Sequence, residues 1–203
     1  MPGFKKPFVL AINGSPHGDG VVAELLDLTL RGAAEFGAEV KRVDLYKLNI
    51  LPAPGNFSRE PASETVAAMP ADDMRALYPD IIRADALVLG TPVYWMNMSG
   101  VMKTFIDRLT PLESDGNQLE GKLAAFVAAS KENHGGGESA AMAMATALLQ
   151  MGCMIPPNGV MWHPGAWEEG GEAQASWAMN DAPRVGKTIV NILGALRSKD
   201  WIE

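Results

Sequence analysis

Short apolar runs alternate with longer amphipathic segments along this chain, and each run has the length of a β-strand. Continuous apolar character is typical of strands that are buried on both faces. A more polar run is expected to form a strand at the sheet edge. The predicted strands cover Phe8 to Ile12, the polar run Glu39 to Leu45, Asp85 to Gly90, Lys122 to Ala129, and a segment within Met151 to Val160.

The segments between these runs carry apolar residues at the spacing of one helix face. Helices are predicted from Val21 to Gly37, from Asp72 to Ile82, after Ser99, from Ser139 to Met151, and from Asp181 to Leu196. The side chains expected to face the core are Val22, Leu25, Leu26, Leu30, Ala33, Val101, Met102, Phe105, Ile106, Leu109, Val185, Ile189, Ile192 and Leu196. Strands that alternate with helices predict an α/β fold with a parallel, doubly wound sheet.

We predict the strand order 2-1-3-4-5, because it brings the loops after the first, third and fourth strands together at one edge. Ligands of open α/β sheets bind outside that edge. The proline-rich segment Leu48 to Pro70 has no sustained period and is expected to be an excursion that covers the site or a subunit contact. We expect a single domain over residues 1–203.

The first loop, Asn13 to Gly20, is rich in glycine and lies between a strand and a helix. Its glycines let the backbone approach a ligand, and the free amides and positive dipole end of the helix favour an anion such as phosphate. The spacing matches neither the dinucleotide fingerprint nor the phosphate loop that ends in Gly-Lys-Ser/Thr. A tight turn whose glycines serve geometry alone is the alternative interpretation.

The second loop begins where Thr91 and Pro92 end a strand, since proline cannot donate to a ladder. Tyr94 and Trp95 then offer flat, polarisable surfaces, and Ser99 is expected to cap the next helix. We expect a planar ring as the ligand of this loop. In the alternative interpretation, the aromatic pair fills the seam between sheet and helix.

The third loop, Ser130 to Ser139, contains a glycine run whose amides can converge on one acceptor. A last stretch, Trp162 to Trp167 together with Trp177, is expected to form a long loop rich in glycine and aromatic residues. Two interpretations of its tryptophans carry equal weight. They form a lid or subunit interface, or they pack against the last helix.

The net charge of −7 argues against nucleic acid or an anionic membrane surface as partner and favours a small molecule. The apolar run near the N-terminus is far shorter than a signal or a membrane span, which predicts a cytoplasmic protein.

Cys153 stands alone, which excludes an internal disulfide or a metal centre of several thiolates, and we expect a buried structural thiol. Asp72 and Asp73 are interpreted as helix caps rather than metal ligands.

Three stretches of the chain occur together in one known family. They are Asn13-Gly14-Ser15-Pro16; Thr91-Pro92-Val93-Tyr94-Trp95 with Met98-Ser99-Gly100 and Lys103 to Arg108; and Gly135-Gly136-Gly137-Glu138. With the succession of strands and helices, the sequence from Phe8 to Val160 resembles the flavodoxin-like NAD(P)H-dependent FMN reductases. That group also includes quinone reductases and iron-sulfur flavoproteins. The resemblance implies a flavodoxin-like fold with a five-stranded sheet.

The resemblance also implies an FMN-dependent oxidoreductase that transfers a hydride from NAD(P)H to a flavin, a quinone or a similar small acceptor, as a homodimer or homotetramer. We name no catalytic residue, because the hydride chemistry belongs to the cofactor. His134 is interpreted as a polar surface residue rather than a proton donor. The residues implied in cofactor binding are Ser15, His17, Gly18, Gly20, Val21, Val22, Pro92, Val93, Tyr94, Trp95, Met96, Asn97, Ser130, His134, Gly135 and Gly136.

Two departures from the family pattern bear on the cofactor. Val21 and Val22 stand where relatives usually carry Asn followed by Thr or Ser, so a hydroxyl for the phosphate is missing, and His17 is the candidate substitute. The segment from Leu48 to Met74 holds no cysteine, which excludes the iron-sulfur centre of some relatives.

Two other functions fit the same fold. A flavodoxin-type electron carrier is less favoured, because carriers are strongly acidic around the flavin and this chain has no acidic residue between Thr91 and Thr104. A flavodoxin-like fold with weak or lost flavin binding is suggested by Val21 and Val22.

Overall fold

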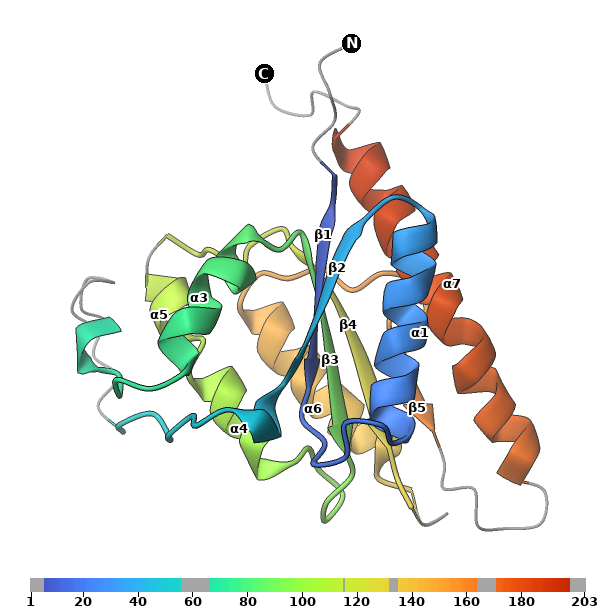
Figure 1. Ribbon diagram of the computed structural model, residues 1–203, viewed down its shortest axis with the longest axis horizontal. Coiled ribbons are helices and arrows are strands. Elements are labelled where there is room, and N and C mark those ends of the chain that lie inside the picture. Colours follow the sequence, from blue (N-terminus) through green and yellow to red (C-terminus); the bar gives the residue numbers. More distant parts are fainter. Residues whose placement is uncertain (1–5, 56–65, 115, 132–134, 164–170, 198–203) are drawn as a thin grey trace.

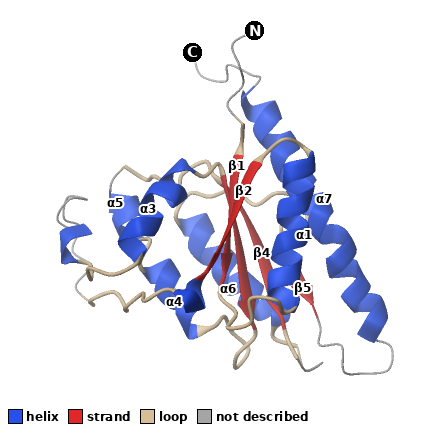
Figure 2. Ribbon diagram, in the orientation of Figure 1, coloured by secondary structure: helices blue, strands red, loops and turns tan. Residues whose placement is uncertain are grey.

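A parallel sheet of five strands forms the centre of the molecule, with helices on both of its faces (Figure 1, Figure 2). The structure is a computed structural model that describes residues 6–55, 66–114, 116–131, 135–163 and 171–197. The strand order is β2-β1-β3-β4-β5, as predicted. The loops after β1, β3 and β4 gather at the lower edge of the sheet in Figure 1, where the carboxyl ends of the strands lie.

The first four strands lie where the hydrophobic pattern predicts them. The strands are β1 (Phe8–Asn13), β2 (Glu39–Asp44), β3 (Ala86–Pro92), β4 (Leu123–Ala129) and β5 (Val160–His163). β1 is buried along its whole length, whereas β2 alternates in exposure at the edge of the sheet. Pairing continues through Thr91 and Pro92, which lie opposite Ala128 and Ala129, so the prediction that β3 stops at Gly90 is wrong by two residues.

The last strand lies further along the chain than its apolar pattern predicts. Within Met151 to Val160, Met154 makes only an isolated bridge to Leu123, and β5 begins at Val160. Between them the chain makes a turn, in which the N–H of Gly159 donates to the carbonyl of Pro156 at 2.9 Å. Trp162 and His163 therefore belong to β5 and not to the loop predicted for them.

Four of the predicted helices lie within about two residues of their expected bounds, but the short helix α5 was not predicted and the last helix begins earlier than Asp181. They are α1 (Val21–Glu35), α3 (Met74–Arg83), α4 (Gly100–Asp107), α5 (Thr110–Ser114), α6 (Gly137–Gln150) and α7 (Gly171–Arg197), with a 3₁₀ turn η1 (Leu45–Lys47). α1 and α7 cover one face of the sheet, and α3, α4 and α6 cover the other (Figure 1). No helix in these described segments is long and apolar enough to cross a membrane.

α1 and α7 pack backbone against backbone. A Cβ atom built on Gly32 would lie 2.0 Å from the carbonyl oxygen of Pro183, and one on Gly186 would lie 1.9 Å from that of Thr29. Only glycine fits at this crossing, because any side chain would force the two helices apart.

α7 corrects three expectations. It begins at Gly171, so Trp177 lies in a helix and not in a loop, and its side chain is 73% exposed. Leu196 is exposed, because the last turn of α7 projects beyond α1 (Figure 1), and Leu193 is the leucine that packs inward. Trp167 lies outside the described residues.

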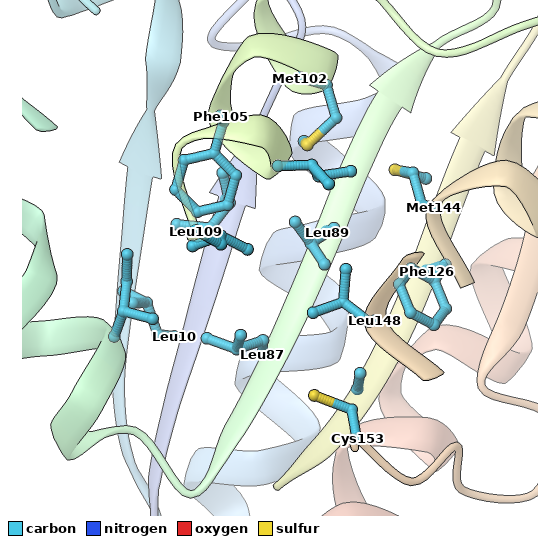
Figure 3. Close-up of a cluster of buried hydrophobic side chains, with 14 of the residues drawn as sticks. Leu10, Leu87, Leu89, Met102, Phe105, Leu109, Phe126, Met144, Leu148 and Cys153 are labelled. Atoms are coloured by element: carbon cyan, nitrogen blue, oxygen red, sulfur yellow. The ribbon is translucent and has the colours of Figure 1, made fainter. Parts of the chain in front are cut away.

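A hydrophobic cluster fills the space between the sheet and the helices α4 and α6 (Figure 3). Phe105 and Met102 of α4 and Met144 of α6 reach the strands there, as expected for α4. Cys153 is buried beside this cluster, and its thiol lies 3.4 Å from the carbonyl oxygen of Leu119. Burial raises the pKa of Cys153 to about 11, as expected for a buried thiol that stays protonated near neutral pH.

Candidate functional site

The first loop is held at its start by hydrogen bonds that run through Asn13. Its side-chain amide donates to Oδ1 of Asp44 at 3.0 Å, and its Oδ1 accepts from the N–H of Ser15 at 3.0 Å. Ser15 Oγ accepts from the N–H of His17 at 3.2 Å. Gly14 N–H donates to the carbonyl of Gly90 at 2.7 Å, which ties the loop to β3. The loop is thus fixed at the carboxyl edge of the sheet.

The end of this loop leads into α1 without a side-chain cap. Gly20 is the N-cap residue and has no side chain to accept from the first helical amides, and the N–H of Glu24 donates to its carbonyl at 2.9 Å. The amides of Val21 and Val22 precede that first helical hydrogen bond, so the helix offers them no carbonyl. Together with the positive end of the helix dipole, they form a site suited to an anion.

The second loop is a tight hairpin with an unusual backbone. Tyr94 and Asn97 exchange backbone hydrogen bonds of 2.9 and 3.1 Å, and the two residues between them have positive φ angles, 50° at Trp95 and 63° at Met96. Two adjacent left-handed residues other than glycine store strain. Trp95 is 99% exposed at the tip, so it does not fill a seam between sheet and helix.

Ser99 connects the second loop to the first. Its Oγ accepts from the N–H of Met102 at 3.3 Å, which confirms the predicted cap, and donates to the carbonyl of Gly14 at 2.8 Å. Its N–H donates to Thr91 Oγ1 at 2.9 Å. A single buried serine therefore sets the relative position of the two loops.

The third loop approaches the second so closely that a glycine is required. Gly135 and Gly136 have φ angles of 88° and 89°, which favour glycine. A Cβ atom on Gly136 would lie 2.9 Å from Val93 Cγ1 and 3.0 Å from Met96 Sδ. His134 lies outside the described residues.

The three loops enclose two adjoining cavities. One has a volume of about 590 Å³ and is lined by Val93, Tyr94, Trp95, Met96, Ser130, Lys131 and Gly135. The other has a volume of about 330 Å³ and is lined by Ser15, His17, Gly20, Val21, Val22, Pro92, Val93, Tyr94, Ala129, Ser130, Lys131 and His163. Four residues line both cavities, so the two form one trough from the start of α1 to the glycine run. Such volumes are typical of small-molecule sites.

Most residues that the sequence implied in cofactor binding line this trough. Gly18, Asn97 and Gly136 belong to the same loops but do not line it. Ala129, Lys131 and His163 also line the trough but were not among the implied residues. His163 is buried at the end of β5, and the signal for it was the arrival of a further parallel strand at the same edge.

Two groups outside the lining of the trough have shifted pKa values. Burial raises the pKa of Tyr46 in η1, with a smaller contribution from Tyr94. Burial alone would raise the pKa of Asp44, but hydrogen bonds from Lys47 and Asn13 outweigh it, and the pKa lies below its ordinary value.

Comparisons of the sequence give consistent matches. The sequence model described as NADPH-dependent FMN reductase matches residues 7–168. An iron-sulfur flavoprotein of Archaeoglobus fulgidus is 27% identical over 203 residues, which cover 94% of this chain and 97% of that protein. An iron-sulfur flavoprotein of Methanocaldococcus jannaschii is 31% identical over 132 residues, covering 64% of this chain and 66% of that protein. An NAD(P)H dehydrogenase (quinone) of Methanosarcina barkeri is 38% identical, but over 40% of this chain and 39% of that protein.

Solved structures share the fold at low sequence identity. The structure of RosB with a bound 8-demethyl-8-formylriboflavin 5′-phosphate superposes with a TM-score of 0.76 at 16% identity, covering 96% of this chain and 82% of that chain. An NAD(P)H:quinone oxidoreductase from Methanothermobacter marburgensis gives a TM-score of 0.66 at 20% identity, covering 90% of this chain and 96% of that one. These likenesses confirm the flavodoxin-like arrangement of the sheet and helices.

Proposed function

Because the chain belongs to the NADPH-dependent FMN reductase family, we propose that it transfers a hydride from NAD(P)H, through bound FMN, to a flavin, a quinone or a similar small acceptor. Membership makes the chain an NAD(P)H-dependent oxidoreductase with FMN as its cofactor. The observation that carries the proposal is the single trough formed by three loops at the carboxyl edge of the sheet.

The chemistry of the trough fits FMN from end to end. At one end, the buried Ser15 hydroxyl and the amides that start α1 suit a terminal phosphate. At the other end, Val93 and Tyr94 offer the apolar wall that a flat ring requires. Gly136 admits no side chain against Val93, so the backbone of the third loop comes close to that wall.

Bound FMN supplies the hydride chemistry, and the residues of the trough bind, orient and shield. Amides around Gly135 and Gly136 are suited to hydrogen-bond the polar edge of the ring and to stabilise negative charge there. Tyr94 and Trp95 line the larger cavity and are exposed, so their rings are suited to stacking against a planar acceptor. No side chain is assigned as a general acid or base.

We extend the proposal to a homodimer or homotetramer that takes small molecules as its electron acceptors. The support is exposed aromatic surface at separate places, Trp95 on the second loop and Trp177 on α7. The net charge of −7 supports a small acceptor over nucleic acid.

The decisive experiment is anaerobic reduction of the purified protein after reconstitution with FMN. Titration with NADPH or NADH, followed through the visible absorbance of the flavin, is expected to bleach the bound cofactor. Addition of a quinone or free FMN should then restore the absorbance. A protein that binds no FMN, or whose FMN neither nucleotide reduces, would contradict the proposal.

A further inference from the structure

Arg42 lies on the edge strand β2, outside the trough, yet it contacts the first loop. Its Nη2 donates to the carbonyl oxygen of Gly18 at 2.9 Å, its Nη1 pairs with Asp27 of α1, and its Nε lies 3.1 Å from Oδ1 of Asp44. The side chain is only 20% exposed. One guanidinium therefore connects the first loop, the first helix and the edge strand.

The hydrogen bond from Arg42 to the Gly18 carbonyl fixes the orientation of the Gly18–Asp19 peptide, which would otherwise rotate easily. Gly18 and Gly20 flank Asp19, and glycine permits rotation of the neighbouring peptide planes at little cost. A carbonyl oxygen that turned toward the trough would repel a phosphate. Because the peptide is planar and trans, holding the Gly18 carbonyl against Arg42 directs the N–H of Asp19 away from β2.

Asp44 extends the same support to the start of the loop. It forms an ion pair with Arg42, and it accepts hydrogen bonds from Lys47 at 2.7 Å and from the side chain of Asn13 at 3.0 Å. Asn13 in turn accepts from the N–H of Ser15, the residue whose hydroxyl lines the trough. The pair Arg42–Asp44 thus holds the loop at two points, Gly18 and Asn13.

The charges around Arg42 indicate that it supports the first loop and does not itself bind the phosphate. Asp27 and Asp44 both oppose the guanidinium, so its charge is already paired within the protein. The start of α1 carries valines at positions 21 and 22, which leaves backbone amides, Ser15 and His17 as the groups that can bind phosphate there. A site built from backbone amides depends on their being fixed in advance.

We infer that Arg42, acting with Asp44, is a positioning residue that sets the preference of this site for a flavin with a terminal phosphate. The inference rests on the proposed binding of FMN. It goes beyond that proposal by assigning phosphate selectivity to residues that do not line the trough. Selectivity, measured as the ratio of riboflavin to FMN dissociation constants, is the quantity that a merely structural residue would leave unchanged.

The test compares FMN and riboflavin binding by fluorescence titration of the full chain. Arg42→Met is expected to weaken FMN binding about tenfold, as for one lost charge-assisted hydrogen bond, and to change riboflavin binding less than about twofold. Arg42→Lys should restore part of the preference, since an ammonium can still donate to one acceptor. Arg83→Met is the matched control, because Arg83 pairs with Glu39 of the same strand at 2.8 Å but far from the first loop.

Each outcome decides a separate point. If Arg42→Met weakens both flavins equally, or neither, the positioning role is wrong while FMN binding stands. If the wild-type protein binds neither flavin, the proposed function itself fails. If Arg42→Met does not fold by circular dichroism, Arg42→Lys decides, and an unchanged FMN preference in that folded variant overturns the inference.

Discussion

Arg108 and Asp72 form a buried ion pair, with 2.6 Å between Nη1 and Oδ2 and side-chain exposures of 0% and 1%. The guanidinium also donates to the carbonyls of Leu51 and Pro70, at 2.7 and 3.2 Å. Asp72 in turn accepts from the N–H of Met74 at the start of α3, whereas Asp73, the N-cap residue, makes no side-chain cap hydrogen bond, so the predicted capping role is confirmed for Asp72 and wrong for Asp73. The pair holds both ends of the proline-rich segment against α4, in place of a regular crossover.

Removing only one partner of this ion pair should strongly lower the free energy of unfolding. We expect Arg108→Met to lower the free energy of unfolding by about 3–5 kcal/mol, because Asp72 would remain buried without its counter-charge. The double variant Arg108→Met with Asp72→Leu should lose much less than the sum of the single changes. Urea denaturation measures all three variants. A loss below about 1 kcal/mol for Arg108→Met would contradict the structural role.

Asp44 should contribute a pH-dependent part of the stability. Its folded-state pKa lies below the ordinary value of 3.8, so the unfolded chain takes up a proton first as the pH falls. This contribution is complete above 3.8 and is lost as the pH falls through the lower folded-state pKa. The unfolding free energy of Asp44→Asn should therefore fall less steeply than that of the wild type below that pH. Identical slopes in denaturation series at decreasing pH would contradict the prediction.

The sheet could be predicted from the sequence because buried parallel strands leave continuous apolar runs. β1, β3 and β4 are such runs, and their order followed from the need to gather the three loops. β5 was misplaced because Met151 to Ile155 has the same apolar character, although only Met154 pairs with a strand. Apolar content alone does not separate a strand from a buried connection.

The polar side chains that hold the loops of the site in place could not be predicted from such local patterns. Arg42, Asp44 and Arg108 act on residues 24 to 57 positions away, and no local pattern encodes such contacts. His163 was placed in a loop because its strand was misplaced. Residues on the glycine-rich and aromatic loops were predictable, since their types constrain the backbone locally. Their binding of the cofactor stays a prediction.

The two valines at the start of α1 offer a direct test of the missing hydroxyl. Val21 is 39% exposed, whereas Val22 is 4% exposed and packs toward Gly90. We therefore expect Val21→Thr to tighten FMN binding by about 0.5–1.5 kcal/mol, the typical net value of one hydrogen bond. Val22→Thr is the matched control. Val22 also lines the trough, but its side chain packs toward Gly90, so a hydroxyl there would be largely buried and should cost about 1–3 kcal/mol of stability and add less affinity than Val21→Thr.

Calorimetric titration with FMN measures both variants, and thermal unfolding reports the stability of Val22→Thr. Tighter binding by Val22→Thr but not by Val21→Thr would show that the second valine faces the phosphate. Unchanged affinity in both variants would mean that the start of α1 does not bind phosphate through side chains.

Substitutions at the two adjacent left-handed glycines of the third loop test the effect of backbone strain separately from that of steric contact. Gly135 and Gly136 have nearly the same φ, but a Cβ atom on Gly135 would meet nothing within 4 Å. On Gly136 it would press on Val93 and on Met96, both of which line the larger cavity. Each alanine substitution should cost about 1–2 kcal/mol of backbone strain.

Only Gly136→Ala should in addition displace the wall of the trough. We expect it to weaken FMN binding at least about tenfold more than Gly135→Ala does, since misplacement of a packed wall removes well over 1 kcal/mol of contact. Fluorescence titration with FMN measures the ratio, and thermal unfolding of both variants corrects for strain. Equal affinity in the two variants would show that the approach of the third loop to Val93 and Met96 does not shape the flavin site.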